Sequence, residues 1–227
     1  MVRLVGMRGI AAIALVACGA GPAGPAAAPP RPAAPGIDLA TPVALGMVDG
    51  PSTATLTVIE AFDLQCPHCA RVQGPLDELV REHRGRIRVV YKSWVLPQHT
   101  RAAHVAACAA GKQGKFRAFV DALRVEQSRH EPTPEEVMQL LEHGTQPAWT
   151  TDAALPAVAR AVGLDLAAFE ADRQGAWCRA FVDRDQREMD RFAIASLPFF
   201  VIGDQRLATW SKDELRAVID ARLAAPR

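Results

Sequence analysis

The chain has 227 residues and a formal net charge of +1, and 22% of its residues are charged while 49% are hydrophobic. A nearly neutral chain has no basic surplus to attract phosphates, so its composition argues against a nucleic-acid partner. Beyond the N-terminal segment it has no long apolar run, so we expect no second membrane segment. Roughly 185 residues remain after the N-terminal segments, enough for one domain with a sizeable core.

The N-terminus has the pattern of an export signal. A basic segment precedes the apolar run of residues 9–17, which is too short to span a bilayer. The sequence Leu15-Val16-Ala17-Cys18 also resembles the lipobox of bacterial lipoproteins, where cleavage leaves a cysteine that becomes lipid-modified. We therefore expect a signal peptide over residues 1–17 and a lipid anchor at Cys18. The alternative is an ordinary secretory signal, cut after a nearby alanine, which discards Cys18.

Both interpretations place the protein outside the cytoplasm, in the periplasm. The segment 18–41 consists largely of Gly, Ala and Pro, and it has too little apolar bulk to offset the entropy lost on ordering. It is therefore predicted to be a disordered linker between the anchor and a domain over residues 42–227. Gly19 after Cys18 favours the outer over the inner membrane.

The first strong strand signal is ATLTVIEAF, residues 54–62. Its β-branched residues predict a strand that is buried on both faces. Alternation then places Glu60 on the same face as Val58 and Phe62. Burial without a partner would raise the pKa of this carboxyl and suit it to carrying protons. The alternative is an edge strand with Glu60 in water.

A cysteine pair, Cys66-Pro67-His68-Cys69, follows this strand and opens a helical pattern. Free amide groups and the helix dipole favour a thiolate at the first turn, which is where Cys66 lies. His68 can add a positive charge or a hydrogen bond to the same sulfur. Cys69, one turn on, is expected on the inner face, where it can close a disulfide but is poorly exposed to substrate.

The helix after the motif is amphipathic and is predicted to close at Gly85. Gly74-Pro75 interrupts it, and because the apolar stripe continues past the proline we expect a kink rather than an end. Residues 86–94 are a second strand, which completes a β-α-β unit with parallel strands.

Residues 97–195 are predicted to be an all-helical block, and strand signals return after it. A Gly203-Asp204 turn joins two late strands, and a capping box at Ser211 opens the last helix. Within the block, helices are expected over residues 102–110, 113–123 and 151–162, from a capping box at Thr133, and in the stretch 165–193. The late strands are expected over residues 198–202 and 206–209.

This order of elements resembles the thioredoxin fold, an α/β architecture, with an inserted helical block over about residues 97–195. More narrowly, the chain resembles the DsbA family of thiol-disulfide oxidoreductases. The stretches that carry the resemblance are Glu60 and Phe62 before the Cys66–Cys69 motif, RVVYK from Arg88, AACA from Ala106, QGKF from Gln113 and LPFFV from Leu197.

The resemblance implies roles that spacing alone does not reveal. Glu60 would help to move protons near Cys69, and Pro198 would be cis and lie against the cysteine pair. The backbone of Leu197 would pair with an extended substrate segment, although relatives more often have valine, threonine or isoleucine there. No cofactor is implied. The expected partners are reduced or unfolded exported polypeptides and a quinone-linked membrane protein that reoxidises the pair.

The sequence therefore predicts a periplasmic, lipid-anchored enzyme that introduces disulfides by exchange at Cys66 and Cys69. The dipeptide between the cysteines resembles that of oxidases, and residues 19–40 are expected to be too few and too disordered for the dimerisation domain that isomerases of this fold carry before the catalytic domain. A reductase of the same fold is one alternative. A lipid-anchored binding or assembly factor without redox turnover is another.

Two further cysteines, Cys108 and Cys178, are solitary and lie in the helical block. In an oxidising compartment they can form a structural disulfide, while Cys108 in an alanine-rich helix can equally be a small core residue. Zinc sites built from cysteines usually need two CxxC pairs, and this chain has one. His68, His99 and His104 match no standard ligand spacing, so we expect no metal.

Overall fold

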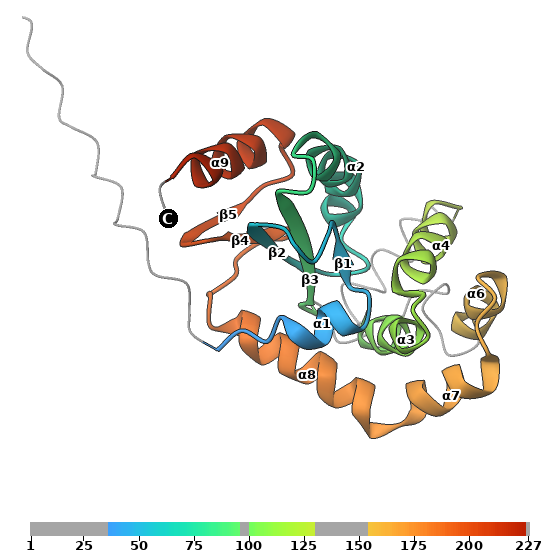
Figure 1. Ribbon diagram of the computed structural model, residues 1–227. Helices are drawn as coiled ribbons and strands as arrows, with labels where there is room; N and C mark the ends of the chain where they lie inside the picture. The colour runs from blue at the N-terminus through green and yellow to red at the C-terminus, as the bar shows by residue number, and fades with distance from the viewer. Residues whose placement is uncertain (1–35, 96–99, 130–153, 226–227) are drawn as a thin grey trace, which may run out of the picture. The chain divides into compact units, whose positions relative to one another are not determined.

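The structure is a computed structural model that describes residues 36–95, 100–129 and 154–225. The predicted signal peptide, the Cys18 anchor, the linker before residue 36, His99 and the capping box at Thr133 lie outside the described residues. In the described part of the chain (Figure 1), the strands are β1 (Val48–Asp49), β2 (Leu56–Phe62), β3 (Ile87–Ser93), β4 (Phe199–Ile202) and β5 (Gln205–Ala208). The helices are α1 (Ala40–Ala44), α2 (Pro67–Glu82), α3 (Arg101–Lys112), α4 (Phe116–Arg129), α6 (Leu155–Ala161), α7 (Leu166–Gln174), α8 (Ala176–Asp190) and α9 (Lys212–Ala224).

The strands form one sheet in the order β1-β3-β2-β4-β5. β2 lies at its centre, parallel to β3 and antiparallel to β4. The register places Glu60 of β2 between Tyr91 of β3 and Phe200 of β4. The prediction of a β-α-β unit is therefore confirmed, and the alternative of an edge strand for Glu60 is wrong.

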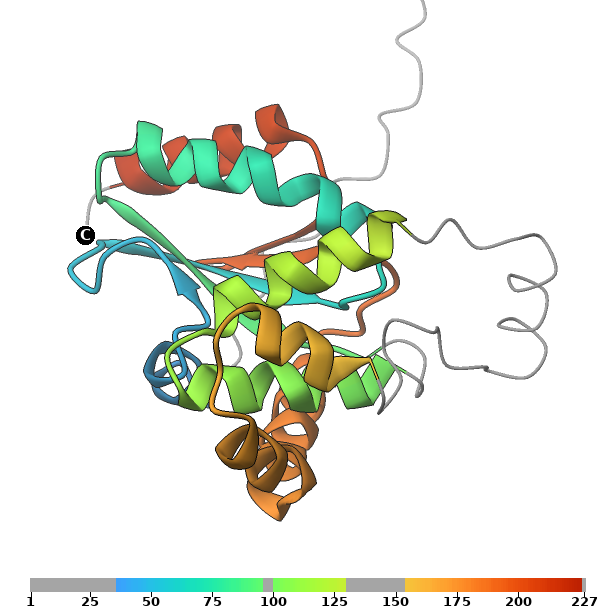
Figure 2. The same cartoon turned by 90° about the vertical axis from the view of Figure 1, so that its right-hand side faces the viewer.

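Helices lie against both faces of this sheet (Figures 1 and 2). α2 and α9 lie side by side over one face, while α3 and α8 belong to the helical block on the other side. Residues of both parts form one hydrophobic core, in which the ring of Phe62 contacts those of Tyr91 and Phe116 edge to face. The inserted block therefore shares the core of the sheet and is not separate from it.

α2 continues through Pro75 to Glu82, as its uninterrupted apolar stripe predicts. The stripe of Cys69, Val72, Leu76 and Leu79 is fully buried, so packing stabilises the helix despite the proline. The final helix also begins as predicted, because the Ser211 hydroxyl accepts a hydrogen bond from the amide of Glu214.

Glycines divide the helical block more finely than its apolar pattern indicates. Gly114 has a φ of +69°, so α4 begins at Phe116 and not at the predicted Gln113. The stretch 165–193 is divided at Gly175, where extended backbone separates α7 from α8. None of the described helices is long and apolar enough to cross a bilayer.

Candidate active site

The cysteine pair lies where the central strand β2 passes into α2. Cys66 is the N-cap residue of α2, and Pro67 fills the first helical position, where a missing N–H costs nothing. The loop before it is closed by Asp63, whose carboxylate accepts from the Gln65 amide at 2.8 Å and whose carbonyl accepts from the Cys66 amide at 3.1 Å. The Cys66 sulfur is therefore held at the open amide end of a helix.

The two thiols are free in this structure, and their surroundings differ sharply. Cys66 is partly exposed, whereas Cys69 is fully buried. A hydrogen bond from the Cys69 thiol, helped by the backbone amides of Cys69 and His68, lowers the pKa of Cys66 to about 6 against the opposing effect of burial. Burial above all raises the pKa of Cys69 far above that of an ordinary thiol. One sulfur is thus an accessible, stabilised anion and the other a buried proton donor.

The segment before β4 lies against the exposed sulfur. The Cys66 sulfur lies 3.8 Å from the carbonyl oxygen of Leu197, and the Leu197-Pro198 peptide bond is cis. Leu197 lies just before β4 and Cys66 follows β2 in the chain. Because these two strands pair, the sheet brings the two residues together. Leu197 therefore lies beside Cys66, and Pro198 follows it in the chain.

Glu60 is fully buried in the sheet beneath the pair. Its two carboxylate oxygens have no hydrogen-bond partner among the described residues. Burial raises the pKa of Glu60 to about 8, and the nearby Arg124 opposes this shift only in part. A carboxyl with such a pKa can take or give a proton near neutral pH, which matches the property that its position in the strand predicts.

The His68 side chain contacts a residue outside the motif. Its backbone amide helps to stabilise the Cys66 thiolate, but its ring stacks on Trp210 with centroids 4.2 Å apart and planes 14° apart. Arg71 approaches the ring at Nδ1, at 3.5 Å. No sequence signal linked Trp210 to this motif, since 142 residues separate it from His68 along the chain.

A buried polar cluster behind the loop was also missed from the sequence. The Asp63 carboxylate accepts from the Thr100 hydroxyl at 2.7 Å and lies 3.3 Å from Nε2 of His104, whose Nδ1 is 3.0 Å from the Ser93 hydroxyl. These side chains join the active-site loop to β3 and to the start of α3. His104, considered above as a metal ligand, is therefore a hydrogen-bonded core residue, and the described residues contain no cluster suited to a metal ion.

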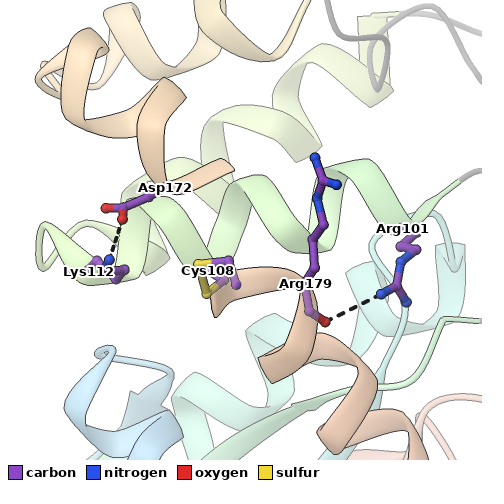
Figure 3. Close-up of a disulfide and its surroundings, with 6 residues drawn as sticks. Arg101, Cys108, Lys112, Asp172 and Arg179 are labelled. Carbon is purple, nitrogen blue, oxygen red and sulfur yellow. Dashed lines mark hydrogen bonds and ion pairs between the residues drawn. A yellow bond between two sulfur atoms is a disulfide. The ribbon is translucent and has the colours of Figure 1, made fainter. Parts of the chain in front are cut away.

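Cys108 of α3 and Cys178 of α8 form a disulfide, with 5.7 Å between their Cα atoms (Figure 3). The bond joins two helices of the inserted block whose cysteines are 70 residues apart in sequence. Two polar contacts of α3 flank it: Lys112 with Asp172 of α7, and Arg101 with the carbonyl of Arg179 of α8 at 3.3 Å. The structure thus favours the disulfide over the alternative of a core thiol.

Comparison with curated proteins finds similarity to parts of larger chains. The protein is 29% identical over 200 residues to an Na(+)/H(+) antiporter NhaA 1 of Salinispora arenicola, a match that covers 84% of this chain and 27% of the relative. A match to NhaA of Herminiimonas arsenicoxydans, 27% identical, covers 77% of this chain and 25% of that relative. The chain therefore spans about a quarter of the length of these relatives.

Comparison with solved structures supports the fold. A thioredoxin-like oxidoreductase from Silicibacter pomeroyi superposes with a TM-score of 0.59 at 26% identity, covering 78% of this chain and 92% of that one. BdbD from Bacillus subtilis gives 0.63 at 15% identity, with coverages of 86% and 97%. DsbA2 from Pseudomonas aeruginosa gives 0.56 at 20% identity, with coverages of 78% and 93%.

The Thioredoxin_4 family, described as thioredoxin, matches residues 44–221. The matched range contains all five strands of the sheet, both cysteines of the motif and most of α9. The fold, an α/β thioredoxin-like sheet with an inserted helical block, is the one that the order of sequence elements predicts. The chain therefore belongs to the Thioredoxin_4 family, the DsbA-like group of thioredoxin-fold proteins.

Proposed function

We propose that the protein introduces disulfides into exported polypeptides by thiol-disulfide exchange at Cys66 and Cys69. The observation that carries this proposal is the contrast between the two sulfurs, one partly exposed with a pKa of about 6 and the other fully buried with a raised pKa. A stabilised Cys66 thiolate is a good leaving group, and its stability favours the reduced enzyme. Both effects make the disulfide form an oxidant.

The exchange proceeds in two balanced steps. A substrate thiolate attacks the Cys66 sulfur of the enzyme disulfide, so that a mixed disulfide forms and the Cys69 sulfur leaves as a thiolate. Cys69 then takes a proton, which Glu60 can supply because its pKa lies near 8. A second substrate thiolate attacks the substrate's sulfur in the mixed disulfide, which closes the substrate disulfide and releases the Cys66 thiolate. The substrate loses two electrons and the enzyme gains them.

Partners and location complete the proposal. An extended substrate segment would pair with the backbone of Leu197, beside the sulfur under attack. Reoxidation would fall to a quinone-linked membrane protein, and a lipid at Cys18 would anchor the enzyme to a membrane. Incorporation of labelled fatty acid into the full chain, and its loss on Cys18→Ser, tests the anchor.

The central test is the trapping of covalent adducts through Cys66. With Cys69 replaced by alanine and Cys66 first converted to its mixed disulfide with glutathione, the thiolate of a reduced exported protein that has a single cysteine should displace glutathione. That protein should then remain attached through Cys66, because neither Cys69 nor a second substrate thiol is present to resolve the mixed disulfide. The matched control is Cys69→Ala combined with Cys66→Ala, which should trap nothing. A Cys69→Ala protein without adducts would mean that the fold serves as a binding platform.

The direction of exchange is tested separately by equilibrating the Cys66–Cys69 pair with glutathione buffers. An oxidase requires a pair that is reduced more readily than thioredoxin's, whose potential is about −270 mV. A potential at or below that value would support the reductase alternative instead.

A further inference from the structure

The stack of His68 on Trp210 takes no part in the exchange steps described above. Trp210 lies between β5 and α9, and 53% of it is exposed although its ring contacts a residue of the redox motif. Its backbone is fixed on both sides, because the Thr209 hydroxyl accepts from the Ser211 amide at 2.9 Å and Ser211 caps α9. The indole is therefore a surface for the His68 ring that is held in place by the fold.

Arg71 contacts the same imidazole from its own helix. A guanidinium has only N–H donors, so Nδ1 of His68 must be the acceptor in the 3.5 Å contact with Arg71. Trp210 and Arg71 therefore both contact the imidazole, whereas the groups that stabilise the Cys66 thiolate are the Cys69 thiol and the backbone amides of Cys69 and His68.

We propose that Trp210 is a positioning residue that holds the His68 imidazole away from the Cys66 sulfur and thereby limits the oxidising strength of the pair. This inference rests on the proposed redox function of Cys66 and Cys69. An imidazole released from the stack can turn toward the sulfur and donate a hydrogen bond, or approach it as an imidazolium. Either contact stabilises the thiolate and so favours the reduced enzyme.

A double-mutant cycle measures this effect through the equilibrium of the pair with glutathione. Trp210→Ala should shift the equilibrium toward the reduced enzyme by about threefold to tenfold, the range expected for one added hydrogen bond to an exposed anion. In a His68→Ala background the same substitution should change the equilibrium by less than about twofold. Trp210→Phe, which keeps an aromatic face for the ring, should restore most of the original equilibrium.

Trp177→Ala is the matched control, since this tryptophan is 49% exposed and stacks on Phe181 of α8 instead of on the motif. It should leave the equilibrium unchanged. Equal shifts in the two His68 backgrounds, no shift in either, or a His68-dependent shift toward the oxidised enzyme would each overturn the inference. A wild-type pair that does not exchange with glutathione at all would overturn the proposed function, which is a distinguishable result.

Discussion

At the scale of single residues, the site depends on two sulfurs whose protons are held with very different strength. Cys66 accepts hydrogen bonds at the start of α2, while Cys69 is enclosed by the core and lies near Glu60. The hydrogen bond between the thiols lowers the pKa of Cys66 and raises the pKa of Cys69, because Cys69 is the donor and Cys66 is the acceptor. This one bond therefore widens the difference between the two pKa values.

The pH dependence of alkylation tests this arrangement. In the reduced protein, the rate of Cys66 modification by iodoacetamide should be half-maximal near pH 6, because the thiolate is the reactive form and the pKa of Cys66 is lowered to about 6. A free cysteine would give a midpoint near 8.5. Cys69→Ala removes the largest stabilising contact, so its midpoint should rise, and a wild-type midpoint above about 8 would contradict the arrangement.

The same group links the stability of the reduced protein to pH. The pKa of Cys66 is lower in the folded state, at about 6, than in the unfolded chain, whose thiol has an ordinary pKa of about 8.5. Its contribution to stability is therefore fully present above pH 9 and is lost as the pH falls through 6. This is the pH dependence expected of an acid whose pKa is lower in the folded protein than in the unfolded chain.

The ionisation of Glu60 changes stability with pH in the opposite direction to that of Cys66, which leads to a second prediction. Burial raises its pKa from 4.5 to about 8, so the stability of the wild-type protein should fall as the pH rises from 4.5 through 8. Glutamine at this position cannot ionise. The free energy of unfolding of Glu60→Gln should therefore rise by a few kcal/mol relative to that of wild type as the pH increases from 4.5 to 8. Urea unfolding of both reduced proteins at pH 5 and pH 8.5 measures this, and a constant difference would contradict a buried, proton-binding Glu60.

Sequence reasoning succeeded for the residues whose neighbours lie close along the chain. Cys66 at a helix start and Glu60 in an apolar strand are local patterns, and both could be predicted. The Trp210 stack and the contacts of Asp63 with His104 join segments that only the folded chain brings together. No local pattern of residue types encodes such contacts.

At the scale of elements, two helical glycines have opposite roles. Gly111 lies in α3, where an added Cβ would stand 2.7 Å from the carbonyl oxygen of Leu45. Gly74 lies in α2 with nothing within 4 Å of an added Cβ. Close approach to the backbone after α1 requires the first glycine, whereas no contact requires the second.

Alanine substitutions at these two glycines should therefore have opposite effects on unfolding. Gly111→Ala should destabilise the protein by about 1–3 kcal/mol, because the backbone at Leu45 must move. Gly74→Ala should stabilise it by about 0.5–1 kcal/mol, because alanine favours a helix interior. Urea unfolding measures both, and a stabilising Gly111→Ala would mean that the approach of α3 to Leu45 is not needed.

Helix boundaries show where pattern reasoning loses precision. The apolar stripe of α2 correctly outweighed Pro75, since buried side chains on both sides of the proline hold the helix. Gly114 and Gly175 interrupt the helical block within otherwise periodic stretches. A glycine inside such a pattern is compatible with either a helix or a break, and packing decides between them.

At the scale of the whole molecule, a buried ion cluster joins the sheet to the helical block. The Lys92 ammonium of β3 contacts Asp185 of α8 at 2.8 Å and Glu188 at 2.9 Å. Glu188 also accepts from the Asp38 amide at 3.2 Å, so the segment before α1 is attached to the same point. Burial raises the pKa of Asp185 to about 6 although Lys92 opposes the shift.

Removing the lysine should be costly because two buried carboxylates would lose their cation. Lys92→Met should destabilise the protein by about 3–5 kcal/mol at pH 8. The loss should be smaller at pH 5, where Asp185 can be protonated. Lys112→Met is the matched control: its partner Asp172 is partly exposed, so about 1 kcal/mol or less is expected. Equal losses for the two variants in urea unfolding would contradict the importance of burial.

The order of elements along the chain was sufficient to predict the architecture, because a β-α-β unit and a late hairpin can complete one thioredoxin-like sheet in few ways. The ion cluster was not predicted. Lys92 and Asp185 are 93 residues apart, and a lysine within a strand pattern gives no indication of its partner. The architecture could be predicted because it follows from the order of elements along the chain. The ion cluster could not, because its residues are distant in sequence and meet only after folding.

The bond between Cys108 and Cys178 makes a closed covalent ring of the chain between them. A single cut by a protease anywhere from residue 109 to residue 177 leaves both fragments joined, so the nicked protein migrates as one chain until a reductant is added. The sheet, with its redox pair, lies entirely outside that ring. Breaks in the polypeptide between Cys108 and Cys178 therefore do not separate the segment that carries the motif from the segment that carries the cis proline.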